Sequence, residues 1–293
     1  MGVHSLVLIV LLLGGGVGQA QQPETLSLLG TPLFAPPIDS DARRQLEADL
    51  TAARAAYKEK PDADRALRVA QVSVSLGHLG DAIEIETRAI EAFPNDLRLY
   101  AARGRTFITL RKFDLAVRDL SRTAQPAEGQ PAALDPALQY DLGLAHYLKG
   151  EFGPAAQALE TFLKSATDPE ARTAADFWLY ISLQRLGRHD EANRIVQQLS
   201  SENASDDPYV QVLQYYKGTR PENSLDVKGA GGVTAAYGIA ARGLWTGAVH
   251  EARTSFKRIV EKDVKEWTVP AYIAAEAELA RLTPAERKKL KVK

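Results

Sequence analysis

Residues 76–83 read LGHLGDAI, and four later segments repeat this pattern of a short turn that leads into a helix. In each segment an apolar or ring-bearing residue precedes an alanine by three positions. The later copies are LRKFDLAV at 110–117, KGEFGPAA at 149–156, LGRHDEAN at 186–193 and TGAVHEAR at 246–253. The shared alanines are separated by 34, 39, 37 and 60 residues. A repeat with a period of about 34 residues therefore organises the chain, and the last interval leaves room for an insertion.

Apolar residues on both sides of the first turn recur with the period of an amphipathic helix. Before the turn, Ala66, Val69 and Ala70 share one helix face, and after it Ala82 and Ile83 begin a second face. The small side chain at position 82 lets the two helices approach closely. The pattern predicts an antiparallel pair of helices in each repeat, stacked into an all-α solenoid.

At these positions the chain resembles the tetratricopeptide repeat (TPR) family, over residues 63–200 and again over 233–262. Tyr180 and Ala240 depart from the family pattern, because they stand where the first helix of a hairpin usually carries glycine. The resemblance implies a TPR-like α-solenoid of antiparallel helical hairpins. Amphipathic segments at 41–57 and 270–282 are predicted to be capping helices that cover the first and fifth repeats.

These observations predict six consecutive regions. They are a signal peptide at 1–20, a proline-rich linker without fixed structure at 21–40, a capping helix with repeats one to four at 41–200, an insertion or linker at 201–232, a fifth TPR-like hairpin with a capping helix at 233–283, and a basic tail at 284–293. Within the insertion we expect a helix near 209–217.

The amino-terminal segment has the features of a secretory signal, although it lacks a Lys or Arg at its start. An apolar run at 6–13 is followed by the small residues Gly18 and Ala20, which fit a cleavage site. We therefore expect export, to the periplasm or outside the cell, with no transmembrane anchor after cleavage. The chain has no cysteine, so lipid attachment through a thiol is excluded.

The carboxy-terminal third resembles a narrower group. FWLYISL at 177–183, YYKG at 215–218, DVKEW at 263–267 and AEAELARL at 275–282 are similar to the last part of NlpI-type bacterial TPR proteins. Those proteins are envelope adaptors that hold murein hydrolases and a processing protease together and are not themselves enzymes. The resemblance implies protein partners, but membrane anchoring does not carry over because those adaptors are anchored through a lipidated cysteine.

Composition and motifs argue against several other functions. A net charge of −1 gives no basic excess for nucleic acid, and the five histidines include no pair at metal-ligand spacing. The GAGG stretch at 229–232 lacks the context of a phosphate-binding loop, so a flexible loop is expected, and Asp206-Asp207 is better explained as a helix cap than as a cation site. We expect no enzyme, no cofactor and no metal.

In TPR arrays the ligand-facing groove is lined by the first helix of each hairpin. The groove residues of these first helices are those at positions that avoid the packing face. In this chain, the positions predict a protein-binding groove formed by Gln71, Arg98, Arg105, Tyr140, Tyr147, Phe177, Gln184, Arg185, Tyr237 and Trp245. Arg98 and Arg105 are seven residues apart, so both point the same way and can clamp a carboxylate of a partner peptide. The alternatives are that Tyr140, Tyr147 and Phe177 belong to the core and that the arginines are merely solvated.

The sequence therefore predicts an exported TPR scaffold that binds other proteins through its groove, in bacterial envelope assembly or in regulation of peptidoglycan hydrolases. The alternative is a fixed, non-catalytic subunit of an envelope enzyme complex. A third hypothesis, an enzyme with a site across 200–232, is disfavoured by the missing catalytic motifs.

Overall fold

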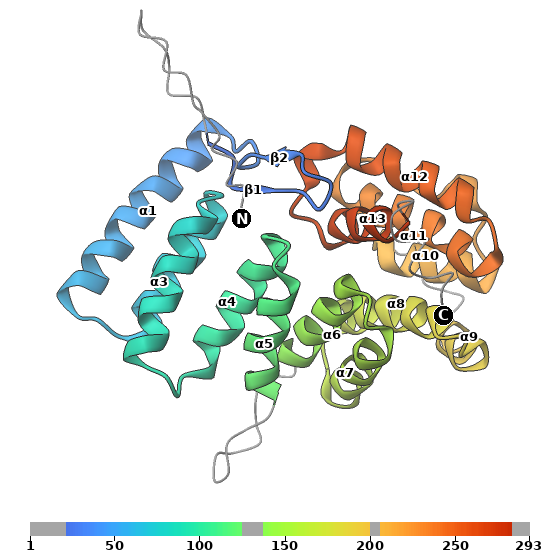
Figure 1. Ribbon diagram of the computed structural model, residues 1–293, viewed down its shortest axis with the longest axis horizontal. Coiled ribbons are helices and arrows are strands. Elements are labelled where there is room, and N and C mark those ends of the chain that lie inside the picture. The colour runs from blue at the N-terminus through green and yellow to red at the C-terminus, as the bar shows by residue number, and fades with distance from the viewer. Residues whose placement is uncertain (1–21, 125–136, 200–205, 283–293) are drawn as a thin grey trace, which may run out of the picture.

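The computed structural model describes residues 22–124, 137–199 and 206–282, and these form a curved stack of α-helices (Figure 1). The predicted signal peptide and basic tail lie outside this part of the chain. The first seven helices are α1 (Ser40–Glu59), α2 (Ala63–Ser75), α3 (Leu79–Ala92), α4 (Leu97–Thr109), α5 (Phe113–Ala124), α6 (Ala137–Lys149) and α7 (Phe152–Ser165). The remaining six are α8 (Pro169–Arg185), α9 (His189–Gln197), α10 (Pro208–Lys217), α11 (Gly229–Thr246), α12 (Val249–Lys262) and α13 (Pro270–Arg281).

The helices pack as the repeat predicts. Five antiparallel hairpins are formed by α2 with α3, α4 with α5, α6 with α7, α8 with α9, and α11 with α12, while α1 covers the first of them. The first helices of successive hairpins also contact one another, α2 with α4, α4 with α6 and α6 with α8, so they line the inner side of the curve. The fold is an all-α, TPR-type solenoid, and the prediction of the fold class is confirmed.

Local signals set the helix boundaries. The side chains of Asp62, Asp96 and Asp168 accept hydrogen bonds from backbone N–H groups in the first turns of α2, α4 and α8. Asp207 does the same for α10, through an Oδ1 contact of 2.7 Å to the Tyr209 amide, which confirms its predicted role as a cap. Such side chains satisfy N–H groups that have no partner within the helix.

Small residues bring the two helices of a hairpin together. The five alanines shared by the repeats, at positions 82, 116, 155, 192 and 252, are all buried. Gly104 and Gly143 lie where a β-carbon would be 2.7 Å from Leu120 Cγ and 2.6 Å from Leu159 Cγ, respectively. A methyl group does not fit at either place, so glycine is required for the close approach of α4 to α5 and of α6 to α7.

We expect Gly143→Ala to lower the free energy of unfolding by about 1–2 kcal/mol, because overpacking against Leu159 outweighs the better helix propensity of alanine. Gly153→Ala is the matched control. Nothing lies within 4 Å of a β-carbon at Gly153, which is in the first turn of α7, so the same substitution is expected to stabilise by about 0.5–1 kcal/mol. Urea denaturation of both variants measures the difference, and equal signs would contradict the close-approach explanation.

The proline-rich segment at 21–40 is not an unstructured tether, and that prediction was wrong. Residues 24–34 form an N-terminal β-hairpin in which strand β1 (Thr25–Leu26) pairs antiparallel with β2 (Pro32–Leu33). Leu33 is buried in the main core, and the indole Nε1 of Trp267 donates a hydrogen bond of 2.7 Å to the Phe34 carbonyl. The hairpin is ordered by contacts with remote segments, which its own sequence pattern does not reveal.

The segment at 201–232 is also more than a linker. The predicted helix near 209–217 is confirmed as α10, but its residues from Val210 to Tyr215 are buried against α8, α9 and α11. The glycine-rich stretch begins α11 and is not a loop. A β-carbon at Gly232 would lie 2.2 Å from the Val227 carbonyl carbon, so the backbone there passes too close for any side chain.

The last helix covers more than the fifth repeat. All side chains from Ala271 to Leu279 in α13 are buried, and α13 contacts α6 in addition to α11 and α12. The Leu28 amide donates to Glu276 Oε2 at 3.3 Å, and Figure 1 shows the N-terminal β-hairpin lying between the first helices and the α12–α13 end. The hairpin and α13 thus join the two ends of the described solenoid.

Candidate functional site

The predicted groove divides into two halves that differ in how the chain itself covers them. The amino-terminal half is lined by α2 and α4, and the carboxy-terminal half by α6, α8 and α11. Predicted groove residues line a pocket in each half: Gln71 and Arg105 in the first half, and Tyr140 in the second.

In the carboxy-terminal half, Tyr147, Phe177 and Tyr237 have no exposed surface, so their assignment to the groove was wrong. Helices α10 and α11 fold back onto α8 and cover the inner face there. Tyr147 and Tyr237 share a hydrogen bond between their hydroxyl groups, and both pack on Trp178, with ring centroids 5.0 and 5.8 Å away. Burial raises the pKa of the Tyr147 hydroxyl well above its usual value. These aromatic residues belong to the core. For Tyr147 and Phe177, this is the alternative that the sequence left open.

The remaining predicted residues of this half also have partners within the chain. Gln184 is buried, and its Nε2 donates to the Tyr180 hydroxyl at 3.1 Å. Arg185 forms an ion pair with the buried Glu278 carboxylate at 2.5 Å and lies over the Phe152 ring.

Tyr140 and Trp245 are half-buried against aromatic neighbours. The Tyr140 ring lies 5.7 Å from Phe162, and Trp245 packs edge-on against Tyr216 at 5.5 Å. Tyr140 also lines a pocket of about 720 Å³ between α6 and the first turns of α8 and α10, whereas the pockets described here do not include Trp245.

In the amino-terminal half, a pocket of about 360 Å³ opens between α2 and α4. We call it the α2–α4 pocket. Its lining residues are Leu67, Ala70, Gln71, Val74, Ser75, Glu86, Ala102, Arg105, Thr106 and Thr109. The wall from α2 is mainly apolar, and the wall from α4 carries hydroxyl groups and a guanidinium group. Two predicted groove residues, Gln71 and Arg105, thus lie at the same opening.

A buried carboxyl group belongs to this pocket. Glu86 of α3 is only 2% exposed, and its Oε1 accepts a hydrogen bond of 3.2 Å from the Thr106 hydroxyl. Its second oxygen, Oε2, has no hydrogen-bond partner among the described residues. Burial raises the pKa of Glu86 to about 8. The side chain is therefore mostly protonated at neutral pH and carries an O–H donor without a partner in the described structure.

Arg98 and Arg105, the two arginines of the predicted carboxylate clamp, are exposed, but each forms ion pairs with carboxylates of the chain. Arg98 forms ion pairs with Asp96 at 2.6 Å and with Asp64 at 2.7 Å, and these partners raise the pKa of its guanidinium group. Arg105 pairs with Asp141 at 2.6 Å. A partner carboxylate would have to compete with these groups, and the joint clamp stays a prediction.

Sequence reasoning missed Glu86, although a signal for it was present. Ala82, Ala89 and Ile90 place the buried face of α3, and Glu86 lies on that face four residues after Ala82. A carboxylate at a core position of a helix requires either a partner or protonation, and such groups are typical of functional sites.

Other kinds of site find no support in the part of the chain that the structure describes. No group of three or more His, Cys, Asp or Glu side chains there can hold a metal ion. Among the same residues, no helix is both long and apolar enough to cross a bilayer.

Comparison with known proteins gives similarity at the level of helical architecture. No family model matches the chain, and no curated protein matches it. A solved structure of MamA is 22% identical over 53% of this chain and 88% of its own, with a TM-score of 0.44. A second crystal structure of MamA is 18% identical over 68% of this chain and 90% of its own, with a TM-score of 0.42.

Proposed function

We propose that this chain is a non-catalytic scaffold that binds a partner protein in the α2–α4 pocket. The observation that carries the proposal is the contrast within the predicted groove: Tyr147, Phe177 and Tyr237 are core, whereas Gln71 and Arg105 border an open pocket. TPR-type folds present such inner faces to extended or helical segments of other proteins. A rigid stack of hairpins supplies a preformed surface, which lowers the entropic cost of binding.

The pocket favours a segment that combines an apolar side chain with a hydrogen-bond acceptor. Leu67, Ala70 and Val74 offer apolar contacts, and Val74 is 40% exposed. The protonated Glu86 carboxyl offers a donor at the base. A backbone or side-chain carbonyl of the partner that reaches Glu86 would satisfy the donor and gain the hydrogen bond that the described structure leaves unmade.

Location and cellular role are further parts of the proposal. The apolar run at 6–13 and the small residues after it support export, and the resemblance of residues 170–282 to NlpI-type proteins supports a role in the bacterial envelope. Regulation of peptidoglycan hydrolases is the specific role that this resemblance suggests. Localisation of the full-length chain with a carboxy-terminal tag, in cell fractions, tests export independently of binding.

A pair of matched substitutions tests the binding site. We expect Val74→Asp to reduce recovery of partner proteins from an envelope extract about tenfold, because a carboxylate placed on the apolar wall has to be desolvated on binding. Val227→Asp is the control, since Val227 is 51% exposed and lies outside the pocket. Both variants are expected to unfold at the wild-type denaturant midpoint.

Site-specific cross-linking makes the test independent of affinity. A photoreactive side chain at Gln71 is expected to capture a defined partner, whereas one at Arg118, on the exposed side of α5, is not. Adducts at both positions, or the same partners recovered with Val74→Asp, would place the binding surface elsewhere.

A fixed subunit of a larger complex remains the second candidate. It is favoured by large apolar side chains exposed on the N-terminal β-hairpin, with Leu26 55% and Phe34 45% exposed. An obligate subunit is expected to aggregate or self-associate when purified alone. Sedimentation of the isolated protein as a stable monomer would argue against this candidate.

A further inference from the structure

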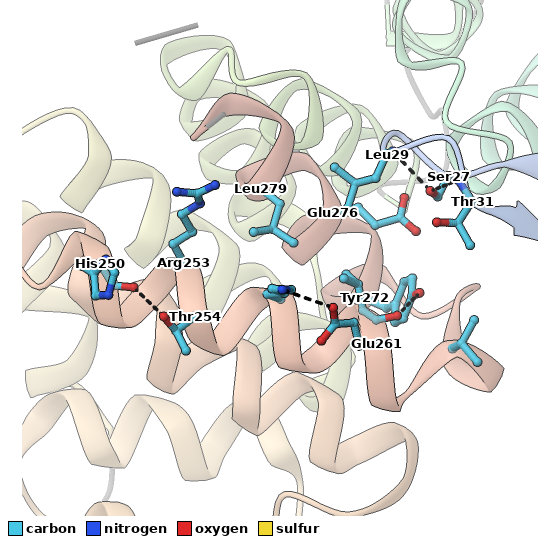
Figure 2. Close-up of a pocket in the computed structure, with 13 residues that line it drawn as sticks. Ser27, Leu29, Thr31, His250, Arg253, Thr254, Glu261, Tyr272, Glu276 and Leu279 are labelled. Carbon is cyan, nitrogen blue, oxygen red and sulfur yellow. Dashed lines mark hydrogen bonds and ion pairs between the residues drawn. The ribbon is translucent and has the colours of Figure 1, made fainter. Parts of the chain in front are cut away.

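Another pocket lies where the N-terminal β-hairpin meets the consecutive helices α12 and α13 at the other end of the described chain (Figure 2). It has a volume of about 730 Å³ and is formed by the tip of the N-terminal β-hairpin, by α12 and by α13. We call it the closure pocket. Its size lies within the range of about 300–1,000 Å³ that is typical of binding pockets.

Apolar side chains form much of the closure pocket's lining. They come from every wall: Leu29 from the β-hairpin, Val260 from α12, and Tyr272 and Leu279 from α13. Figure 2 shows Leu29 and Leu279 on opposite sides of Glu276, with Tyr272 beneath it. The hairpin is held at this place by the Leu28 amide, which donates to Glu276 of α13, and by the Trp267 indole, which donates to the Phe34 carbonyl.

Exposed apolar side chains continue beyond the pocket. Within the described residues, eight large apolar side chains are exposed, and four of them, Leu26, Leu28, Leu29 and Phe34, belong to the N-terminal β-hairpin. A fifth, Val264, lines the pocket itself and is 46% exposed. Several exposed apolar side chains on one short hairpin are typical of a protein interaction site.

The ion pairs at the closure pocket leave one of its lining cations, Arg253, unpaired among the described residues. Glu276 is neutralised by Arg111, at 2.9 Å, and Lys257 lies 3.6 Å from Glu261. Arg253 has no ion-pair partner among the described residues, and His250 lies three positions before it on α12. Arg253 lines the pocket together with the apolar side chains of Val260 and Leu279, so a carboxylate next to an apolar side chain complements it.

From this arrangement we propose that the closure pocket docks an acidic, amphipathic segment of a partner protein. An apolar side chain of the segment enters between Leu29 and Leu279, and a carboxylate pairs with Arg253. The chain's own tail at 284–293 is an unsuitable occupant, because it carries four lysines and would meet Arg253 with the same charge. A lipid bilayer is disfavoured because the surface is a three-walled pocket, whereas bilayers are bound by flat or protruding apolar faces.

Selection from a random peptide display library tests this proposal without a known partner. The full chain is the bait, and peptides that also bind the Leu29→Asp variant are removed. We expect the remaining peptides to combine bulky apolar residues with Asp or Glu. Enrichment of basic peptides, or no peptide that distinguishes the two baits, would overturn the proposal.

The best peptide then allows a charge exchange, measured by fluorescence anisotropy. Arg253→Glu is expected to weaken binding about tenfold or more, because attraction becomes like-charge repulsion. Replacing the peptide's acidic residues by Lys is expected to restore binding to Arg253→Glu and to abolish it for wild type. Arg258→Glu, an exposed position on α12 outside the pocket lining, is the matched control and should bind as wild type.

Two further outcomes separate this proposal from others. Val74→Asp is expected to bind the peptide unchanged, so failure at the α2–α4 pocket and failure at the closure pocket are distinguishable. Binding to vesicles of phosphatidylglycerol that is lost in Arg253→Glu, together with no selected peptide, would assign the surface to membranes and overturn the proposal. Self-association that is lost in Leu29→Asp would instead assign it to a second copy of the chain.

Discussion

Arg111→Met is expected to lower the free energy of unfolding by about 3–5 kcal/mol, because it leaves the Glu276 carboxylate buried without its cation. Both side chains are almost fully buried. The guanidinium group donates from Nε and from an Nη nitrogen to the two carboxylate oxygens of Glu276, at 3.0 and 2.9 Å. It also donates to the Trp267 carbonyl at 2.8 Å and lies over that residue's ring.

The backbone at Arg111 supports the importance of this side chain. In the turns of the other four hairpins, glycine occupies the equivalent position with a positive φ, as at Gly77 and Gly150. Arg111 adopts φ 60° and is the only non-glycine residue with a positive φ in the described part of the chain. The left-handed conformation costs a non-glycine residue about 1–2 kcal/mol. The ion pair with α13 offsets that cost and explains why this turn departs from glycine.

Three measurements define the test of the Arg111 prediction. Urea denaturation gives the loss of stability in Arg111→Met. Arg111→Gly is expected to lose about 1 kcal/mol less, because glycine relieves the backbone cost while the carboxylate stays unpaired. Arg111→Met with Glu276→Leu is expected to recover part of the loss, since removing both charges abolishes the unpaired group.

The same variants report on the closure between the β-hairpin and α13. The Leu28 amide donates to Glu276, so its hydrogen exchange is expected to accelerate in Arg111→Met. A loss of stability below about 1 kcal/mol, with unchanged exchange at Leu28, would contradict a structural role for the pair.

Glu86 is expected to make the protein less stable as the pH rises from about 4.5 to about 8. The pKa of Glu86 is raised from 4.5 to about 8, first by burial, while the nearby Thr106, Arg103 and Arg105 act in the opposite direction. Between these values the folded state holds a proton that the unfolded state has lost, so stability falls with increasing pH. The contribution is fully present below pH 4.5 and is lost as the pH passes through about 8.

Glu86→Gln removes this dependence. A shift from 4.5 to about 8 corresponds to about 4–5 kcal/mol, so between pH 5 and pH 9 wild type is expected to lose about 4 kcal/mol more than the variant. At pH 5 the two are expected to agree within about 1 kcal/mol, because glutamine resembles the protonated acid. Denaturation at pH 5, 7 and 9 makes the comparison.

Glu84→Gln provides the control for Glu86, since it makes the same change on the exposed face of the same helix. Its stability curve is expected to run parallel to that of wild type. Parallel curves for Glu86→Gln as well would show that the carboxyl group ionises freely in the folded state.

Much of the fold could be predicted from local signals. The repeated turns around Ala82 and Ala116 placed the hairpins, and Asp207 placed the start of α10. The failures have one cause. Residues 24–34 and the stretch at 229–232 lack helical or strand periodicity, and their structure is imposed by contacts with Trp267 and Val227, which sequence patterns do not report.

The candidate sites were predicted less well than the fold. Gln71 and Arg105 line one opening of the inner face, and their role in binding stays a prediction, but Tyr147 and Tyr237 of the same predicted groove are core. The positions of the packing residues in the TPR pattern identify which side of a first helix faces inward. It does not say whether a later part of the chain covers that side.

Most of the helices, their pairing and the turns between them follow from residues that lie a few positions apart in the chain, and local patterns report such residues. Tertiary structure alone decided which inner surface stays open and how the ends are joined. Tyr147 meets Tyr237 across 90 residues, and Arg111 meets Glu276 across 165. Such contacts depend on how the whole stack curves, which is the sum of small angles at every helix interface and is not encoded in any single repeat.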